Sequence, residues 1–321
     1  MHSFSELSIL FESNFSNRQF PEQPATLYDA AQYILTIGGK RVRPIVVLMG
    51  NELFGEIHKD AFQVAKAIEL FHNFSLIHDD IMDKAPLRRG METVHIKHGE
   101  STALLAGDAM LVVAYEQLIG IDSKYLNQVL TLFSKTAKEV CEGQQLDMDF
   151  EKMDSVSLEQ YIEMIALKTS VLLAASLQMG SVIGAANEKD QQNIYQFGKN
   201  LGIAFQLQDD YLDAFGDPEK FGKQIGGDIL ANKKTCLLIR ALEVSNPSQK
   251  AELVSLLQNN EDKKVEKVLG IFRACEVGEF THTLKEKYFD SAMSHLDQIE
   301  VSTESKSQLL ALAKYLLMRD S

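Results

Sequence analysis

Apolar residues recur at intervals of three and four along most of the chain. The segment 123–150 is typical, with apolar side chains at Leu126, Leu130, Phe133, Ala137 and Val140. This spacing places them on one face of an α-helix, whereas the alternation typical of a β-strand is not sustained over more than a few residues. No proline lies between Pro86 and Pro218, so helices there can run long. The pattern predicts an all-α protein.

The expected helices follow one another without a linker rich in proline or serine. This continuity predicts a single domain over residues 1–321, with residues 1–24 at its periphery. The helices are expected at residues 25–37, 40–54, 58–83, 100–120, 123–150, 157–185, 188–215, 228–245, 248–258, 262–273, 277–298 and 303–318.

Composition limits the partners and the compartment. The chain has 45 acidic and 32 basic residues and a net charge of -13, which argues against a nucleic-acid partner. Its three cysteines are widely spaced and form no Cys-x-x-Cys motif, so reduced thiols in the cytoplasm are expected. The N-terminal residues lack the order of a signal peptide. The most apolar window, 170–186, contains serine, glutamine and glycine and is expected to be a buried core helix, not a transmembrane segment.

One acidic motif occurs twice. Asp-Asp-x-x-Asp begins at Asp79 and ends at Asp83, and begins again at Asp209 and ends at Asp213. On a helix, the first and last aspartates of each motif lie one turn apart and repel each other. Apolar runs precede both motifs, which favours a cleft over a solvated face. Carboxylates without histidine or cysteine suit Mg2+, which keeps waters and takes further oxygens from a phosphate. The pair predicts two metal-binding walls facing one polyphosphate.

Cations cluster in three places: beside the first motif, beside the second, and far from both in sequence. Guanidinium groups bind phosphate in bidentate fashion, while lysines act as point charges. This partition is what two separate phosphate pockets require. In that order the clusters are Arg88 and Arg89; Lys223, Lys233 and Lys234; and Lys40, Arg41 and Arg43.

Taken together, these motifs strongly resemble those of the trans-isoprenyl diphosphate synthases, the polyprenyl synthetase family. The matching segments are 38–44, 76–83 with 87–90, and 205–213 with 215–217 and 222–223. The resemblance implies an isoprenoid-synthase helical bundle around a deep central cleft, usually as a homodimer. It also implies that isopentenyl diphosphate is added head to tail to an allylic diphosphate (dimethylallyl, geranyl or farnesyl), with Mg2+ and with release of pyrophosphate.

The resemblance also assigns roles to particular residues. Asp79 and Asp83 would hold two Mg2+ ions and Asp209 a third, with Asp80 and Asp213 as supporting or water-mediated partners of the metal. Lys168 and Thr169 would mark a helix break whose backbone carbonyl, with the Gln206 side chain, faces the carbocation. The allylic diphosphate would be bound by Arg88, Lys168, Lys223 and Lys233, and the isopentenyl diphosphate by Lys40, Arg43, His72 and Arg89.

Product length is expected to depend on the residues just before the first motif. In the family, bulk at the fifth and fourth residues before the first aspartate sets the floor of the tail pocket; here these are Phe74 and Ser75. One large and one small residue resemble the subgroup that forms the twenty-carbon geranylgeranyl diphosphate. The fifteen-carbon farnesyl diphosphate is the alternative.

Two other classes of protein share part of this pattern. A class I terpene cyclase has helices and one such acidic wall, but it normally carries an Asn/Ser/Glu metal triad in place of the second motif. A non-catalytic partner subunit of a prenyltransferase would be expected to lose aspartates from one motif. Here Asp79, Asp83, Asp209 and Asp213 are all present, which favours the synthase.

Overall fold

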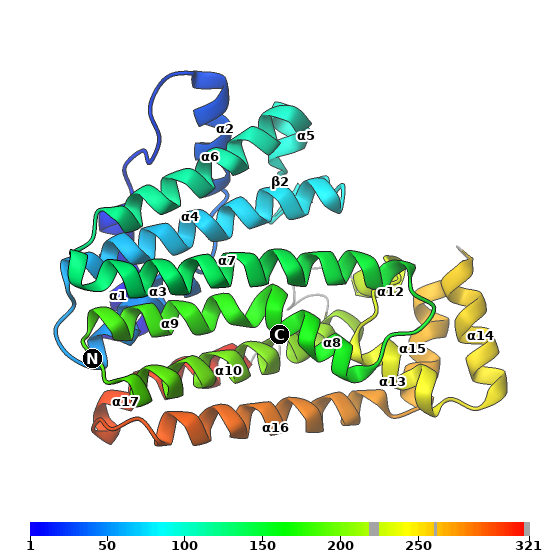
Figure 1. The fold of residues 1–321 in the computed structure, drawn as a ribbon. Helices are drawn as coiled ribbons and strands as arrows, with labels where there is room; N and C mark the ends of the chain where they lie inside the picture. Colours follow the sequence, from blue (N-terminus) through cyan, green and yellow to red (C-terminus); the bar gives the residue numbers. More distant parts are fainter. Residues whose placement is uncertain (218–224, 260–261, 318–321) are drawn as a thin grey trace. The chain divides into compact units, whose positions relative to one another are not determined.

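The computed structural model describes residues 1–217, 225–259 and 262–317, and helices dominate it (Figure 1). Within these ranges the only sheet is an antiparallel pair of two-residue strands, β1 (Leu87–Arg88) and β2 (Met91–Glu92). The all-α prediction is therefore confirmed. The short hairpin is not among the expected elements, because strands of two residues are too short to show a period-two pattern.

The chain divides into two compact units. Unit 1 comprises Met1–Ala137, Ala175–Tyr195 and Ile299–Leu309, and unit 2 comprises Lys138–Ala174, Gln196–Gln298 and Leu310–Ser321. Four of the five boundaries fall inside the helices that span residues 123–152, 171–183, 188–215 and 303–317, and the fifth, at Gln298, lies between two helices. The single domain over residues 1–321 stays a prediction.

Unit 1 holds the first six helices and parts of four later ones. The six are α1 (Phe4–Phe15), α2 (Ala25–Thr36), α3 (Val42–Glu52), α4 (Lys59–Met82), α5 (Val94–His98) and α6 (Glu100–Ile119), and the later ones are α7 (Ser123–Lys152), α9 (Val171–Ile183), α10 (Glu188–Phe215) and α17 (Thr303–Leu317). Helix α4 packs along α6 and against α3 (Figure 1). Gly50 of α3 and Gly180 of α9 let these two helices approach closely, because a Cβ at either glycine would collide with a carbonyl oxygen of the other helix.

Helix α1 lies in the segment expected to be peripheral. A capping box starts it: the Ser3 side chain accepts the Glu6 N–H, and the Glu6 carboxylate accepts the Ser3 N–H. Leu7, Phe11 and Phe15, four residues apart, are buried. The Ser-x-x-Glu sequence followed by this spacing is the signal that identifies such a helix in a sequence.

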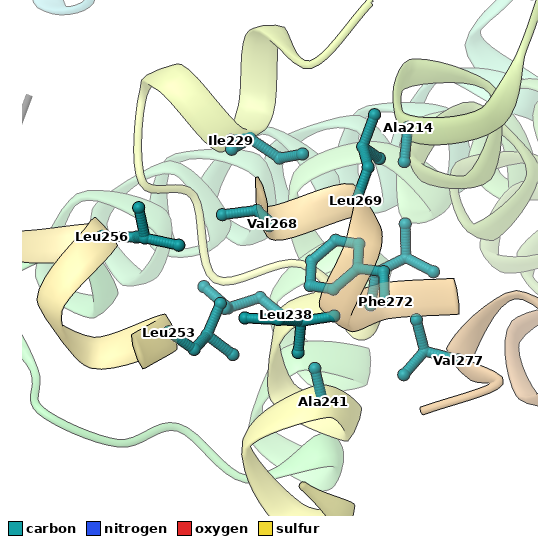
Figure 2. Close-up of a cluster of buried hydrophobic side chains, with 12 residues drawn as sticks. Ala214, Ile229, Leu238, Ala241, Leu253, Leu256, Val268, Leu269, Phe272 and Val277 are labelled. Carbon is teal, nitrogen blue, oxygen red and sulfur yellow. The ribbon is translucent and has the colours of Figure 1, made fainter. Parts of the chain in front are cut away.

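Unit 2 holds the later helices of the chain. Besides the ends of α7, α9 and α10, they are α8 (Leu158–Ile165), the π-helical turn η1 (Ala166–Ser170), α12 (Gly227–Leu230), α13 (Cys236–Val244), α14 (Pro247–Gln258), α15 (Lys264–Ala274), α16 (Val277–Asp297) and the end of α17 (Thr303–Leu317). Buried side chains from α12 to α16 form one apolar cluster, which includes Leu238, Phe272 and Val277 (Figure 2). This cluster anchors the segment that carries Lys233.

The helix predicted over 228–245 is wrong. It is divided into α12 and α13 by a turn in which Asn232 has a left-handed backbone, with φ of 56°. The Thr235 side chain then starts α13 by accepting the Leu238 N–H at 3.4 Å. Apolar spacing alone continues through this turn, whereas asparagine and threonine are common at left-handed positions and helix caps, respectively.

Two helical stretches are long and apolar enough to cross a membrane by length and composition, Glu100–Ile119 and Leu158–Ile183. The second is 78% buried inside the protein, as expected of the core helix at 170–186. The first is 33% buried, and its exposed apolar residues include Leu105, Val112 and Ile119.

Candidate active site

The first aspartate motif lies at the C-terminal end of α4. The Asp83 N–H donates to the Asp79 carbonyl oxygen at 2.9 Å, so the two residues are one helical turn apart, as the sequence predicts. The Asp79 side chain is 24% exposed and Asp83 is exposed. Asp83 is therefore accessible at the end of the helix, and Asp79 is partly accessible, since its Oδ1 atom is buried.

The middle aspartate of this motif has a different environment. Asp80 is 2% exposed, and its two carboxylate oxygens accept hydrogen bonds from Arg88 Nε at 2.8 Å and Arg88 Nη2 at 2.7 Å. Burial lowers the pKa of Arg88, but the hydrogen bonds and charge of Asp80 outweigh burial and raise it. Because Arg88 occupies both of its oxygens, Asp80 orients the guanidinium of Arg88.

The hairpin after α4 carries both arginines of the Arg-Arg-Gly sequence. Arg89 and Gly90 form its turn with φ of 53° and 78°, the conformation of a type I′ turn. The Arg89 guanidinium lies against Gly39, where a Cβ would be 2.7 Å from Arg89 Nη1. Gly39 has φ of 151°, so glycine is required there both for the backbone and for the contact. The hairpin thus brings Arg89 to the turn that precedes the exposed Lys40.

A second pair of polar side chains lies between α3 and α4. Arg43 Nη1 is 3.2 Å from His72 Nε2. Burial, followed by the charges of Arg43 and Arg89, holds the pKa of His72 well below its usual value. His72 is therefore neutral near pH 7, and its Nε2 can accept from Arg43.

Arg41 lies between Lys40 and Arg43 in the sequence, but its role is structural. It forms an ion pair with the buried Glu69 and donates from Nη2 to the Leu35 carbonyl oxygen at 2.7 Å. Asn73 also donates to Glu69, at 2.8 Å. These contacts fix the start of α3 on α4. They explain why Arg43, two residues later, lies beside His72.

The two residues expected to set product length lie on α4, before the motif. Phe74 is buried, and its ring centroid lies 5.6 Å from that of Phe71 and 4.7 Å from that of His78. Phe71 in turn meets Phe133 of α7 at 5.4 Å. The half-buried Ser75 donates its hydroxyl to the His72 carbonyl oxygen at 2.8 Å. Phe74 is thus part of an aromatic cluster built from two helices.

The second motif lies near the end of α10. Asp209 is half-buried and Asp210 is buried. Asp210 accepts from the Tyr161 hydroxyl and, at 3.0 Å, from Gln206 Nε2. Burial, with the charge of Asp228, raises the pKa of Asp210 to about 8 although both hydrogen bonds lower it. As in the first motif, the middle aspartate is buried and forms hydrogen bonds with neighbouring side chains of the protein.

The last aspartate of the second motif holds the segment that follows. Asp213 Oδ2 accepts the Asp228 N–H at 3.1 Å, and the Asp213 carbonyl oxygen accepts the Gly226 N–H at 2.8 Å. The side chain thus caps the start of α12. This contact supports the turn leading to Lys233.

The break expected at Lys168 and Thr169 is present as the π-helical turn η1, in which the Val171 N–H donates to the Ala166 carbonyl oxygen. Such turns disturb the regular pairing of backbone groups and are frequent at functional sites. Thr169 Oγ1 lies 3.4 Å from Gln206 Oε1. Gln206 therefore connects η1 to Asp210, and the three predicted catalytic residues Lys168, Thr169 and Gln206 lie in one part of unit 2.

Two acidic residues of α7 were not among the expected site residues. Asp147 Oδ2 accepts from Lys168 Nζ at 2.6 Å and from Lys233 Nζ at 3.2 Å, and Glu151 accepts from Lys233 Nζ at 2.6 Å. Burial raises the pKa of Asp147, but the two lysines outweigh it and the pKa is lowered. The sequence did hold a signal for Asp147. An acidic residue lies at the helical spacing of the apolar residues Val140 and Phe150, and it is buried on the same face of α7.

The structure brings the predicted residues together within each unit. In unit 1, Arg88 contacts Asp79 and Asp80 of the first motif, and Arg89 lies against Gly39. In unit 2, Gln206 contacts Asp210 of the second motif, and Lys168 and Lys233 meet at Asp147. Lys223 lies outside the described residues.

The donor set suits Mg2+. Asp79 and Asp83 present carboxylate oxygens one turn apart, and Asp209 presents another from α10. Among the described residues no group of three or more His, Cys, Asp and Glu side chains has the arrangement of a metal site. Mg2+ needs no such group, because it is commonly held by one or two carboxylates together with waters and phosphate oxygens.

An all-α fold with two such aspartate motifs and separate groups of cations defines the isoprenoid-synthase class. The family model of polyprenyl synthetase matches residues 24–274. The chain belongs to the polyprenyl synthetase family and is a prenyltransferase. Enzymes of this family are generally Mg2+-dependent and use isopentenyl diphosphate and allylic diphosphates.

Similar proteins cover the chain almost completely. A geranylgeranyl diphosphate synthase of Saccharolobus solfataricus is 38% identical over 99% of both chains. A short chain isoprenyl diphosphate synthase of Methanothermobacter thermautotrophicus is 37% identical over 92% of this chain and 91% of its own. A crystal structure of a geranylgeranyl pyrophosphate synthase superimposes with a TM-score of 0.95 at 45% identity, covering 100% of both chains.

Proposed function

We propose that this enzyme condenses isopentenyl diphosphate with allylic diphosphates head to tail and releases geranylgeranyl diphosphate. One observation carries the proposal. The middle aspartate of each motif is buried and hydrogen-bonded inside the protein, whereas Asp79, Asp83 and Asp209 remain half-buried or exposed. The two motifs thus keep accessible carboxylates for metal, as a substrate diphosphate with bound cations requires.

Three Mg2+ ions are proposed, two held by Asp79 and Asp83 and one by Asp209. When bound, they supply positive charge that stabilises the departing pyrophosphate. Asp80 and Asp213 act as supporting residues, because Asp80 holds Arg88 and Asp213 caps α12. Neither is proposed as a direct ligand.

The cations of unit 1 suit two different phosphate contacts. Arg88 is oriented by Asp80 toward the motif, where its Nη2 is 3.8 Å from Asp79 Oδ2, and is proposed to bind the allylic diphosphate. Arg89 and Arg43 lie toward the Gly38-Gly39 turn and His72. Together with Lys40 they are proposed to bind the isopentenyl diphosphate. Neutral His72, whose Nε2 accepts from Arg43, is proposed to donate a hydrogen bond from Nδ1.

The remaining residues are proposed to act on the allylic substrate. Lys168, Lys223 and Lys233 bind its diphosphate, and their charges stabilise the negative charge that develops on the leaving group. The carbocation left on the allyl group is faced by oxygen dipoles from η1 and from Gln206, whose orientation is fixed by Asp210. The proton lost after coupling passes to pyrophosphate.

Phe74 supports a product of intermediate length. Its buried ring occupies the α4 face shared with Phe71 and His78, and Ser75 beside it leaves the neighbouring position small. The similar geranylgeranyl diphosphate synthases favour the same product. Farnesyl diphosphate is the alternative product, because a tail pocket whose floor lies closer to the first motif would stop the chain one isoprene unit earlier.

A homodimer through α6 is part of the proposal. Leu105, Val112 and Ile119 are 58%, 58% and 64% exposed, and their spacing of seven places them in one stripe, as in helices that pack against a second helix. Val112→Glu should give a monomer by light scattering after gel filtration. Val254→Glu, at an exposed position of α14, is the control.

A cytoplasmic location is proposed from the three free cysteines.

The test of the activity is direct. Purified protein is incubated with MgCl2, isopentenyl diphosphate and, in turn, dimethylallyl, geranyl and farnesyl diphosphate, and the products are sized by mass spectrometry. Elongation to geranylgeranyl diphosphate is expected. No elongation with any primer would defeat the proposal, and a hydrocarbon formed without isopentenyl diphosphate would indicate a terpene cyclase. Asp79→Ala and Asp209→Ala should each abolish turnover while helical content by circular dichroism is retained.

A further inference from the structure

Lys168 and Lys233 come from distant parts of the chain but meet at one carboxylate. Lys168 lies in η1 and Lys233 in the turn between α12 and α13. Their ammonium groups are 2.6 and 3.2 Å from the same oxygen, Asp147 Oδ2. Two ammonium groups that lie this close to one oxygen atom repel each other unless an anion neutralises them. Asp147, which is 8% exposed, supplies that anion.

The backbone around this cluster is fixed on both sides. Gly143, one turn before Asp147, packs against η1 so closely that a Cβ would collide with the Lys168 backbone nitrogen. On the other side, Lys264 Nζ donates to Asn232 Oδ1 at 2.7 Å, and the Lys233 N–H donates to the Asp228 carbonyl oxygen at 2.9 Å. With the backbone fixed, the positions of the flexible Lys168 and Lys233 side chains depend on the groups that their ammonium ends contact.

We infer that Asp147 is a positioning residue that holds the Lys168 and Lys233 ammonium groups at a fixed spacing for one diphosphate. The inference rests on the proposed function. Its physical basis is that a lysine side chain has four rotatable bonds and no preferred direction for its charge. A shared buried carboxylate selects one arrangement of both chains before the substrate arrives, so the ordering does not have to occur during the reaction.

Positioning and simple charge balance differ in their effect on kcat. Asp147→Asn keeps the shape of the side chain but removes its negative charge. If Asp147 positions the lysines, kcat should fall by on the order of tenfold or more, since misplaced groups slow the reaction. Affinity for inorganic pyrophosphate with MgCl2, measured by calorimetry, should be higher, because the two lysines lose a neutralising neighbour. Higher affinity with unchanged kcat would indicate charge balance alone and would overturn the inference.

Two variants serve as controls. Asp149→Asn removes the same charge from an exposed position of α7 that contacts Gln145, and it should match the wild type. Glu151→Gln affects the half-exposed partner of Lys233, and its effect on kcat should be smaller than that of Asp147→Asn. An equal loss of kcat in Asp149→Asn would show that the effect is one of general charge and would overturn the inference.

A double-mutant cycle separates positioning from a merely structural role. Asp147→Asn is introduced into the wild type and into the Lys168→Gln, Lys233→Gln double variant, and pyrophosphate affinity is measured in the four full-length proteins. If Asp147 acts through the lysines, its substitution changes affinity in the wild-type background and not in the double variant. Equal changes in both backgrounds would contradict the inference. This readout needs no turnover, so it stands even if the primer assay of the proposed function fails.

Discussion

The guanidinium of Arg88 forms two hydrogen bonds with the buried carboxylate of Asp80, at 2.8 and 2.7 Å. Asp80 is the second aspartate of a motif whose first and third members are accessible. The same division occurs in the second motif, where buried Asp210 bonds to Tyr161 and Gln206. Each Asp-Asp pair therefore combines a more accessible carboxylate with a buried one that orders its surroundings.

Substitution of Asp80 tests this division. Asp80→Ala leaves Arg88 without its bidentate partner, and breaking a largely buried pair in this way typically costs about 3–5 kcal/mol of stability. The free energy of unfolding, from urea titration, should fall by that order, and KM for the allylic diphosphate should rise. Asp29→Ala is the control, since the exposed Arg18–Asp29 pair should contribute about 0–1 kcal/mol. Equal losses in the two variants would contradict the structural role.

Substitution of Tyr161 tests the support of Gln206. Tyr161→Phe removes the hydroxyl that donates to Asp210 and leaves a buried carboxylate oxygen unsatisfied, at a cost of about 1–3 kcal/mol. Because Gln206 shares Asp210, kcat should fall more than KM changes. The measurement is steady-state kinetics with saturating isopentenyl diphosphate. Tyr315→Phe, at an exposed position, should leave kcat and KM unchanged. An unaltered kcat in Tyr161→Phe would contradict the proposed link between Tyr161 and Gln206 through Asp210.

The pKa of His72 predicts a pH dependence of stability. In the folded protein this pKa lies well below 6.5 because of burial and the neighbouring arginines, while in the unfolded chain it is near 6.5. Below about pH 6.5 the unfolded chain therefore binds a proton that folded His72 does not, and stability is lost as the pH falls. Above that value the contribution is fully present.

The comparison uses urea unfolding at about pH 7.5 and about pH 5.5. The loss on acidification should be smaller in His72→Gln than in the wild type. His282→Gln, at an exposed position of α16, should behave as the wild type. An identical loss in the wild type and His72→Gln would show that His72 takes up a proton in the folded protein.

Truncation of Phe74 should lengthen the product. Phe74→Ala opens space in the aromatic cluster on α4, so products longer than those of the wild type are expected by mass spectrometry. Removing a buried ring also destabilises a protein by about 3–5 kcal/mol. Phe11→Ala, which removes a buried ring stacked on Phe15, controls for loosening of the fold. Unchanged product length in Phe74→Ala would eliminate Phe74 as the floor.

Several features follow from local sequence. Apolar spacing predicts most of the helices, and the α4 and α10 segments are found within one or two residues of their expected ends. The two motifs lie on these helices at the expected spacing. Physically, this succeeds because residues three and four apart share a helix face whatever the rest of the chain does. The Ser3 capping box of α1 belongs to the same category of local signals.

Other features required the folded chain. No local rule distinguishes Asp79 from Asp80: the hairpin folds Arg88 back onto Asp80, and only that contact divides their roles. Likewise Asp147 meets Lys168 and Lys233 across 21 and 86 residues of sequence. Sequence by itself determined most of the helices and the motif spacing, and it predicted the chemistry of metal and diphosphate. Tertiary packing decided which carboxylate meets a cation, because the partner of a buried charge is set by the elements that pack around it.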